Sequence, residues 1–369
     1  MYIYQNKDWP HFTWNQEKLF SLLSEIKLRQ GRLIGRMEGL GFSLQAEAML
    51  QTMTLEIIKS NEIEGEILDA DQVRSSIARR LGMDIAGLVP SDRNVEGVVE
   101  MMLDATQKFK DTLTEARLFG WHASLFPTGY SGMYKIVVGN WRANTAEDPM
   151  QVVSGAIGKE KVHFEAPAAK ALPKEMKLFL DWFNISDIDP LLKSAIAHLW
   201  FVTIHPFDDG NGRIARTIAD MQLARADGSS QRFYSMSAQI RLERKSYYDI
   251  LERIQKESLD ITDWLMWFLL CLDKALKAAE VNLSGVLRKA RYWEWLRTKK
   301  TNERQRLMIN KLLDGFDGKL NTTKWAKIAK CSHDTALRDI VDLIKQGVLE
   351  KESGGSKNTS YNLVELNVT

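Results

Sequence analysis

Hydrophobic positions recur at helical spacing through most of this chain. Stripes of positions i, i+3, i+4 and i+7 lie at Leu19–Ile26, Leu50–Ile58, Tyr247–Ile254 and Trp264–Cys271. Residues spaced in this way share one face of a helix, which is then buried against a core. The tract Leu191–Ile204 is almost entirely apolar and predicts a central buried helix. We therefore predict a mainly α-helical body over about residues 45–280.

One segment interrupts this helical pattern. Residues 152–164 form two short β-favouring pieces around a glycine-containing turn. Such a pattern predicts a β-hairpin, followed here by a loop from Pro167 to Pro173.

The end of the chain has a different pattern. Three short helical patterns cover residues 303–314, 322–330 and 333–346, and Ser332 stands where it can cap the third. Residues 347–350, a Gly354–Gly355 turn and residues 360–363 then predict a small hairpin. Three helices and a hairpin are typical of a winged helix-turn-helix domain.

Composition narrows the class of protein. The 369 residues are 44% hydrophobic and 27% charged, which is ordinary for a globular protein of more than one domain. A net charge of +2 gives no general case for nucleic-acid binding. The two cysteines, Cys271 and Cys331, make a disulfide framework or a cysteine zinc site improbable. Without an apolar leader or a bilayer-length apolar stretch, we expect a cytoplasmic protein with no membrane partner.

The segment from His205 to Arg216, HPFDDGNGRIAR, carries the candidate chemistry. Gly210 and Gly212 flank Asn211 and allow a tight turn whose N–H groups form an anion-binding nest. A helix that begins near Arg213 adds its positive dipole end to the same place. Two arginines three residues apart on one helix face, as here, suit a polyphosphate.

Two further residues of the segment complete a possible catalytic set. Asp209 lies beside the nest and can bind the Mg²⁺ that usually accompanies such phosphates. His205 can accept a hydroxyl proton as a neutral imidazole. The alternative is an ordinary glycine-rich loop with surface charges, which a DGNG turn alone would not exclude.

The whole segment resembles the signature of the Fic family, HPFx(D/E)GNGRxxR, and every defining position is present. The resemblance covers about residues 45–280. It implies an all-helical core with a β-hairpin flap and, typically, transfer of AMP from ATP to a Ser, Thr or Tyr hydroxyl of a protein. Residues 1–80 would then be an N-terminal extension, 81–285 the catalytic core and 286–369 the winged helix.

The resemblance also implies roles for individual residues. His205 would be the base, Asp209 the Mg²⁺ ligand, and Arg216 the partner of the γ-phosphate. The phosphate cradle would consist of Gly210, Asn211, Gly212 and Arg213. Kinase-like Doc relatives replace the second glycine, so the presence of Gly212 favours AMP transfer over phosphate transfer.

Residues outside the signature fit the family less specifically. The hairpin at 152–164 stands where the flap aligns a target side chain by strand addition. Tyr247 and Tyr248 resemble paired tyrosines near the adenine and ribose, although core packing explains them equally well. Gln255 is a weak match to an adenine-contacting Asn. Lys135 stands where many relatives have Arg, with the charge kept.

Residues Ser60 to Gly65, SNEIEG, match the inhibitory pattern of the family, (S/T)xxxE(G/N). Ser60 and Glu64 are four residues apart and share a helix face, and Gly65 can end the helix. If this helix packs beside the nest, Glu64 can pair with Arg216 and take the place of the γ-phosphate. The alternative is a solvated acidic helix end.

Three functions remain open from the sequence. The first is an autoinhibited AMP-transferase that modifies a protein, with itself as one candidate target, and forms a homodimer. The second is a transcriptional regulator that senses nucleotide and binds DNA through the tail, against which Asp334, Asp339 and Asp342 in the third tail helix argue. The third is removal of AMP at the same site. His198 lacks further ligands at metal-binding spacing and is expected in the core.

Overall fold

The computed structural model describes residues 1–83, 87–145, 147–155, 159, 161–313, 315–316, 318–352 and 359–365. They divide into two compact units, Met1–Ala279 and Glu280–Thr369, which are considered separately below. The long helix α11 passes from one unit into the other.

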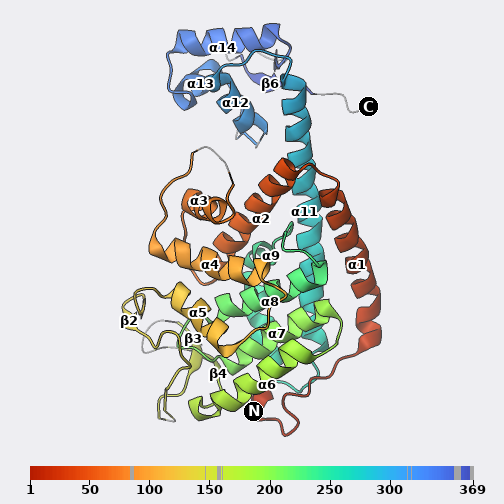
Figure 1. Cartoon of the computed structure of the whole chain (residues 1–369), viewed down its shortest axis with the longest axis vertical. Coiled ribbons are helices and arrows are strands. Elements are labelled where there is room, and N and C mark those ends of the chain that lie inside the picture. The colour runs from red at the N-terminus through yellow and green to blue at the C-terminus, as the bar shows by residue number, and fades with distance from the viewer. Residues whose placement is uncertain are drawn as a thin grey trace. The chain divides into compact units, whose positions relative to one another are not determined.

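Helices dominate the first unit, as the hydrophobic pattern predicts (Figure 1). They are η1 (Ile3–Gln5), α1 (Gln16–Glu38), α2 (Phe42–Ile63), α3 (Ala70–Arg80), α4 (Arg93–Gln107), α5 (Glu115–Leu125), η2 (Ala169–Ala171), α6 (Leu172–Ile185), α7 (Pro190–Ile204), α8 (Asn211–Asp227), α9 (Met236–Leu242), α10 (Arg244–Ile254) and α11 (Thr262–Leu296). Its strands are β1 (Tyr130–Ser131), β2 (Tyr134–Lys135), β3 (Gln151–Ser154) and β4 (Lys161–Glu165).

Helices α7 and α8 form the centre of this unit. Every residue of α7 from Leu191 to Ile204 is buried, as its apolar sequence predicts. The Ser194 hydroxyl donates to the Ala219 carbonyl of α8 (2.9 Å), and the Trp264 indole of α11 donates to the Ala195 carbonyl (2.8 Å). These bonds satisfy polar groups that burial would otherwise leave unpaired. The loop between α7 and α8 is therefore held by two rigid, buried helices.

Helix α2 reaches α8 and ends beside it. Glu56 in its middle accepts hydrogen bonds from the Ser235 hydroxyl and the Ser237 N–H at the start of α9 (2.7 and 3.0 Å). At its end, the N–H of Gly65 bonds to the Glu62 carbonyl and the N–H of Glu66 to the Asn61 carbonyl. Gly65 has φ +87°, and these two bonds make a Schellman turn. The chain thus turns sharply directly after Glu64.

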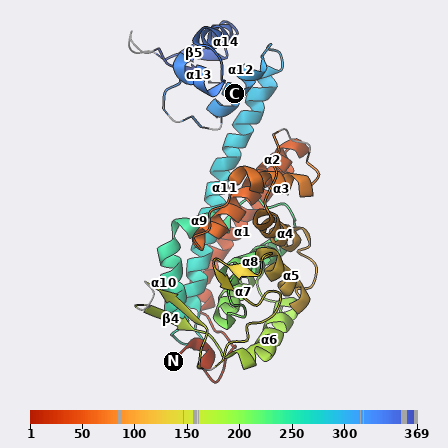
Figure 2. The same ribbon diagram turned by 90° about the vertical axis from the view of Figure 1, so that its left-hand side faces the viewer.

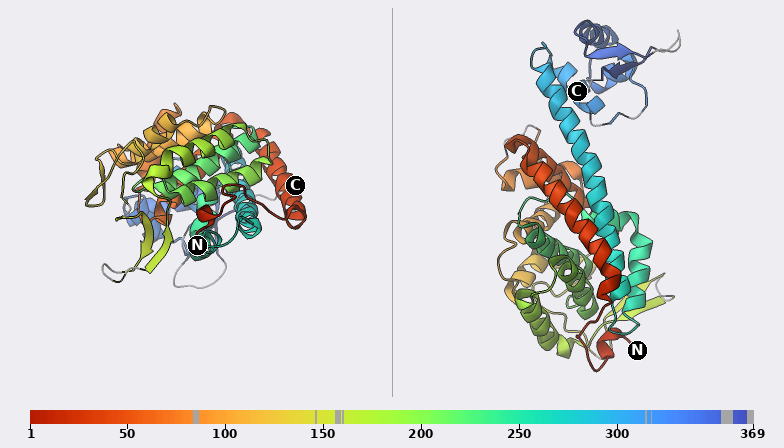
Figure 3. Two further views of the ribbon diagram at one scale, coloured as in Figure 1. Left: turned by 90° about the horizontal axis from the view of Figure 1, so that it is seen from below. Right: turned by 90° about the vertical axis from the view of Figure 1, so that its right-hand side faces the viewer.

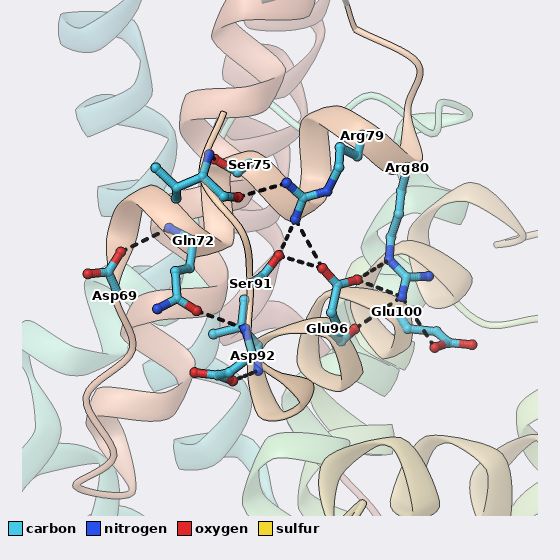
Figure 4. Close-up of polar contacts among 11 residues, drawn as sticks. Asp69, Gln72, Ser75, Arg79, Arg80, Ser91, Asp92, Glu96 and Glu100 are labelled. Carbon is cyan, nitrogen blue, oxygen red and sulfur yellow. Dashed lines mark hydrogen bonds and ion pairs between the residues drawn. The ribbon is translucent and has the colours of Figure 1, made fainter. Parts of the chain in front are cut away.

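A polar network attaches α3, which follows this turn, to α4 (Figure 4). The guanidinium groups of Arg79 and Arg80 pair with the Glu96 carboxylate (3.2 and 3.0 Å), and the Ser91 hydroxyl also donates to it. Burial acts to raise the pKa of Glu96, but these hydrogen bonds outweigh it and lower the pKa to about 2. The Asp69 side chain caps α3 at its start. The turn after α2 is consequently anchored on both sides.

The hairpin expected at 152–164 is present as β3 and β4, which pair antiparallel with a bulge between Val152 and Val153. Its tip, residues 156–158 and 160, lies outside the described residues. Figures 2 and 3 show the strands projecting from the helical body near the N-terminus. At the base, Phe164 packs edge-on against Tyr2 (ring centroids 5.0 Å apart), and His163 bonds to Glu252 of α10 (2.5 Å). The strands are therefore fixed at their base.

The second unit contains the three helices and the small hairpin expected from the sequence. They are α12 (Glu303–Leu313), α13 (Thr322–Ile328), α14 (His333–Lys345), β5 (Leu349–Lys351) and β6 (Tyr361–Leu363). Ser332 caps α14 as predicted, and Trp325 and Ile340 are fully buried in a common core. The Gly354–Gly355 turn lies outside the described residues. DNA binding by this unit remains a prediction.

Among the described residues, none of the helices combines the length and the apolar character that crossing a bilayer requires.

Candidate active site

His205 lies at the corner where α7 ends. Its backbone is left-handed (φ +51°, ψ +59°), which is uncommon for a residue with a side chain and turns the chain away from the helix. The imidazole Nδ1 lies 3.2 Å from the Val202 carbonyl. Because a carbonyl can only accept, Nδ1 carries the hydrogen and Nε2 keeps a free lone pair. Burial lowers the pKa of His205 to about 4. The side chain is thus a neutral imidazole at physiological pH, ready to accept a proton.

Asp209 lies on the loop with its side chain partly exposed. The Ser131 hydroxyl of the β1–β2 hairpin donates to one carboxylate oxygen, and Arg213 lies 3.9 Å from the same oxygen. The neighbouring Asp208 accepts a hydrogen bond from the Val137 N–H (2.8 Å). The two carboxylates therefore have different hydrogen-bond donors, and Asp209 is the one that contacts the Gly210 N–H of the turn.

Gly210 and Asn211 shape the turn itself. Gly210 has φ +79°, and a Cβ there would lie 2.9 Å from the Phe126 ring, so both backbone and space require glycine. The Asn211 amide accepts from the Phe207 N–H (3.0 Å) and donates to the Phe207 carbonyl (2.8 Å). The buried Asn211 thus closes the loop like a piece of backbone. Its side chain therefore holds the cradle in shape, and its predicted role in binding phosphate stays a prediction.

The first two turns of α8 carry two arginines that are almost completely buried. Arg213 is 3% and Arg216 is 2% exposed. Within the described residues, Nε of Arg213 and Nη1 of Arg216 have no hydrogen-bond partner. Buried guanidinium groups require an anion nearby, and free donors of this kind are suited to phosphate oxygens. The turn and the two arginines form a preformed anion site.

Glu64 and Ser60 of the N-terminal region lie at this site. Glu64 pairs with Nη2 of Arg216 (2.8 Å). Ser60 receives two hydrogen bonds from the same guanidinium, at its hydroxyl (2.9 Å) and its carbonyl (2.8 Å). A Cβ on Gly212 would lie 2.2 Å from Oε1 of Glu64, so this carboxylate lies directly on the first turn of α8. Glu64 is the residue that caps α2, one position beyond the helix on which the spacing placed it.

A second carboxylate, Glu66, pairs with Arg213 at 2.6 Å. Sequence reasoning missed Glu66: Gly65 was expected to end the helix, but the sequence does not show which of the nearby acidic side chains then face the site. Each buried arginine of the anion site therefore has its own carboxylate, both from one turn of the chain.

The paired tyrosines have different surroundings. Tyr247 is buried and lies 2.8 Å from the imidazole of His198, so both belong to the core, as expected for His198. Tyr248 is 36% exposed and donates weakly to Oε2 of Glu64 (3.3 Å). Gln255 donates to the buried Thr203 hydroxyl (3.2 Å). Tyr248 thus contacts Glu64 at the anion site, and the hydroxyl of Tyr247 lies close enough to interact with the guanidinium of Arg216.

Sequence reasoning missed His122, which supports the loop from α5. Its Nδ1 accepts from the Gly139 N–H (3.1 Å), which leaves Nε2–H to donate to the Asp209 carbonyl (3.2 Å). The ring stacks on Phe207 (centroids 4.1 Å apart, 5° between planes). Burial lowers the pKa of His122 to about 4, so it stays neutral. No motif marks this residue, because its role depends on the fold.

Two family models match the chain. The Fic/DOC family model matches residues 112–223, a range that contains the loop, Asp209 and both arginines. The chain contains a Fic domain. A second model, described as a domain of unknown function (DUF4172), matches residues 2–83, which include Ser60 and Glu64.

Relatives and solved structures agree with the Fic assignment. The protein adenylyltransferase fic-1 of Caenorhabditis elegans is 30% identical over 184 residues, which are 48% of this chain and 33% of that protein. The chain thus spans about a third of the length of this curated relative.

A Fic family protein from Desulfovibrio desulfuricans superposes over 98% of this chain and 99% of its own (TM-score 0.55, 22% identity). A Fic domain protein from Bacteroides thetaiotaomicron covers 72% of this chain and 97% of its own (TM-score 0.51, 20% identity). These likenesses confirm the mainly helical Fic fold predicted from the sequence.

Proposed function

We propose that this protein transfers AMP from ATP to a hydroxyl group of a protein, and that Glu64 and Glu66 keep it inactive at rest. The observation that carries the proposal is the anion site beside a neutral histidine: two buried arginines at a helix N-terminus, next to a base with a free Nε2. Curated relatives are named protein adenylyltransferases, which supports the same chemistry.

Each group of residues at the site has a separate role in the proposed reaction. The turn Gly210–Gly212, Arg213 and Arg216 bind the polyphosphate of ATP. The target hydroxyl loses its proton to Nε2 of His205 as its oxygen attacks the α-phosphorus. The bond from the α-phosphorus to the bridging oxygen breaks, and pyrophosphate leaves. The strands β3 and β4 offer an edge on which an extended target segment can align its side chain, in the manner of strand addition.

Asp209 is suited to hold Mg²⁺ in this reaction. This ion uses one or two carboxylates and takes its other ligands from water and phosphates, so one exposed carboxylate beside the cradle is sufficient. The described residues contain no group of three or more His, Cys, Asp or Glu that would form an all-protein site. When bound, the ion would neutralise charge on the phosphates, and Ser131 would orient the carboxylate.

In the resting state, the carboxylates of Glu64 and Glu66 occupy the arginines that would bind the phosphates of ATP. The buried arginines need negative charge, which Glu64 and Glu66 supply in the absence of phosphate. Burial acts to lower the pKa of Arg216, but the Glu64 carboxylate outweighs it and raises the pKa, which reflects a favourable pair. ATP must displace these carboxylates to place its phosphates on the same guanidinium groups.

Intact-mass measurement tests the proposed function. Wild-type protein and the Glu64→Gly variant are incubated with Mg-ATP, alone and with a cell extract as a source of targets. The expected result is addition of one AMP mass to Glu64→Gly itself or to an extract protein, with less addition by the wild type. Absence of AMP from every protein with both forms would overturn the proposal. Release of AMP from a modified protein without ATP would identify removal as the main reaction.

The pH dependence follows from the state of His205. The base works only when neutral, and burial lowers its pKa to about 4. AMP incorporation by Glu64→Gly should therefore stay constant from neutral pH down to about 5 and fall as the pH passes through about 4. Initial rates measured over this range, with circular dichroism to show that the protein stays folded, check the prediction. A fall centred near pH 6.5, the ordinary value for histidine, would contradict it.

A further inference from the structure

Arg142, in the segment between β2 and β3, is buried in the catalytic domain although no motif includes it. Only 2% of the residue is exposed, although its side chain carries a charge. A guanidinium carries five N–H donors in a fixed plane, so burying one requires several acceptors in a matching arrangement. The role of Arg142 can therefore be inferred from the acceptors that it binds.

Three consecutive carbonyls at the catalytic corner accept hydrogen bonds from Arg142. Its Nε donates to the His205 carbonyl (2.7 Å), Nη2 lies 3.4 Å from the Ile204 carbonyl, and its backbone N–H donates to the Pro206 carbonyl (2.9 Å). The end of α7 leaves these carbonyls without helical partners. Arg142 therefore satisfies the groups that the left-handed turn at His205 exposes.

The same guanidinium reaches the base of the flap. Its Nη2 donates to the Pro167 carbonyl (2.5 Å), two residues after β4 ends at Glu165. Nη1 donates to the Asn144 side chain of its own segment (2.5 Å). The guanidinium of Arg142 thus links two places. One is the end of the β3–β4 hairpin, which is proposed to align the target, and the other is the backbone of His205, the proposed base.

We propose that Arg142 is a positioning residue that fixes the His205 backbone in its left-handed conformation and sets it relative to the flap. The left-handed conformation is sterically unfavourable for a residue with a side chain, so it persists only where the surroundings hold it. The carbonyl of His205 is held directly by Nε of Arg142. The part of this inference that concerns catalysis rests on the proposed function, while the part that concerns the imidazole does not.

Electrostatics supports the geometric argument. Burial lowers the pKa of Arg142 to about 10, so it remains charged at physiological pH. Burial is the main cause of the low pKa of His205, and the positive charge of Arg142 acts in the same direction. Removing that charge should move the pKa of His205 upward.

Arg142→Met in the Glu64→Gly background tests the proposal. We expect kcat for AMP incorporation to fall by about 10²-fold, since a base misplaced by ~1 Å costs about that much. The KM for ATP should change by less than about 2-fold, because Arg142 contacts none of the nucleotide-binding residues. Arg142→Lys keeps the positive charge but loses the planar set of guanidinium donors, so its kcat should lie between those of the parent and of Arg142→Met. Guanidinium ion added to the Met variant should restore part of kcat.

Arg225→Met is the matched control. Arg225 also donates to two backbone carbonyls, of Phe109 (2.7 Å) and Asp111 (2.9 Å), but at the far end of α8. An equal loss of kcat in this control, or an unchanged kcat in Arg142→Met, would overturn the proposal. Thermal unfolding of all variants shows whether a loss of kcat reflects loss of folded protein.

Titration of His205 by NMR separates this inference from the proposed function. The Cε1–H signal of His205 is assigned by its loss in His205→Ala, and needs no enzymatic activity. In Arg142→Met it should titrate at a higher pH than in the parent protein. An identical titration curve would overturn the positioning role even if AMP transfer is confirmed. If the parent incorporates no AMP but the titration also shifts in Arg142→Lys, which keeps the charge, the proposed function fails and the positioning of His205 stands.

Discussion

AMP incorporation by Glu64→Gly is expected to fall by about 10²–10⁴-fold when His205 is replaced by alanine, the usual contribution of a general base. The Nδ1 of His205 is bonded to the Val202 carbonyl, which leaves Nε2 free to accept the hydroxyl proton. Initial rates of label transfer from α-³²P-ATP measure the effect. ATP affinity, measured by calorimetry, should stay within about 3-fold, because the imidazole is not among the phosphate ligands.

His333→Ala provides the control for this experiment. His333 begins α14 in the second compact unit, so its loss should leave the rate unchanged. Retention of more than about a tenth of the rate in His205→Ala would show that another group takes the proton, since even weak base catalysis exceeds that factor. A parallel loss of ATP affinity would instead place His205 in nucleotide binding.

Replacing the two glutamates should activate the protein in steps. Glu64 pairs with a guanidinium that is 2% exposed, and such charge-assisted bonds contribute about 1.5–3 kcal/mol. Glu64→Gly should therefore tighten ATP binding about 10- to 100-fold. Glu66 is 47% exposed, so its pair with Arg213 is weakened by solvent, and adding Glu66→Ala should contribute about 2- to 5-fold more. Calorimetric titration with a non-hydrolysable ATP analogue measures both steps.

Glu62→Ala is the matched control, because this carboxylate is on the same turn but pairs with Lys59 and Arg241 instead. These partly exposed pairs contribute little, so ATP affinity should change by less than about 3-fold. Equal effects of Glu62→Ala and Glu64→Gly would show that loosening of α2, and not the contact with Arg216, relieves inhibition. If the double variant bound ATP with the affinity of the wild type, neither glutamate would inhibit ATP binding.

The chemistry of the site was largely predictable because it is local in sequence. Twelve consecutive residues, His205 to Arg216, contain the proposed base, the proposed metal carboxylate, the turn and both arginines, so helix periodicity and glycine conformation suffice to assemble them. The proximity of Glu64 and Arg216 was predictable only through the family pattern, since 152 positions separate them and nothing local brings them together.

The roles that the sequence did not predict belong mainly to side chains that bind the backbone of the loop. Arg142 and His122 hold carbonyls of the loop, and any sequence provides carbonyls, so their partners leave no pattern. The role of Glu66 depends on the reversal at Gly65, which decides which of several nearby acidic side chains face the site. Tyr247 is buried beside both His198 and Arg216, so packing and nucleotide binding both stay open for it, and periodicity does not distinguish between them.

The short anchored turn from Glu64 to Asp69 has a consequence for the nucleotide concentration at which the protein would respond. A tethered group acts at a fixed effective concentration, on the order of millimolar for a short flexible link and higher when both ends are held. Both ends are held here, by α2 against α9 and by the network of Glu96. Dilution cannot release such a group, so protein concentration would not set the activity. The length and stiffness of this turn would set an ATP threshold, below which the arginines remain with their own carboxylates.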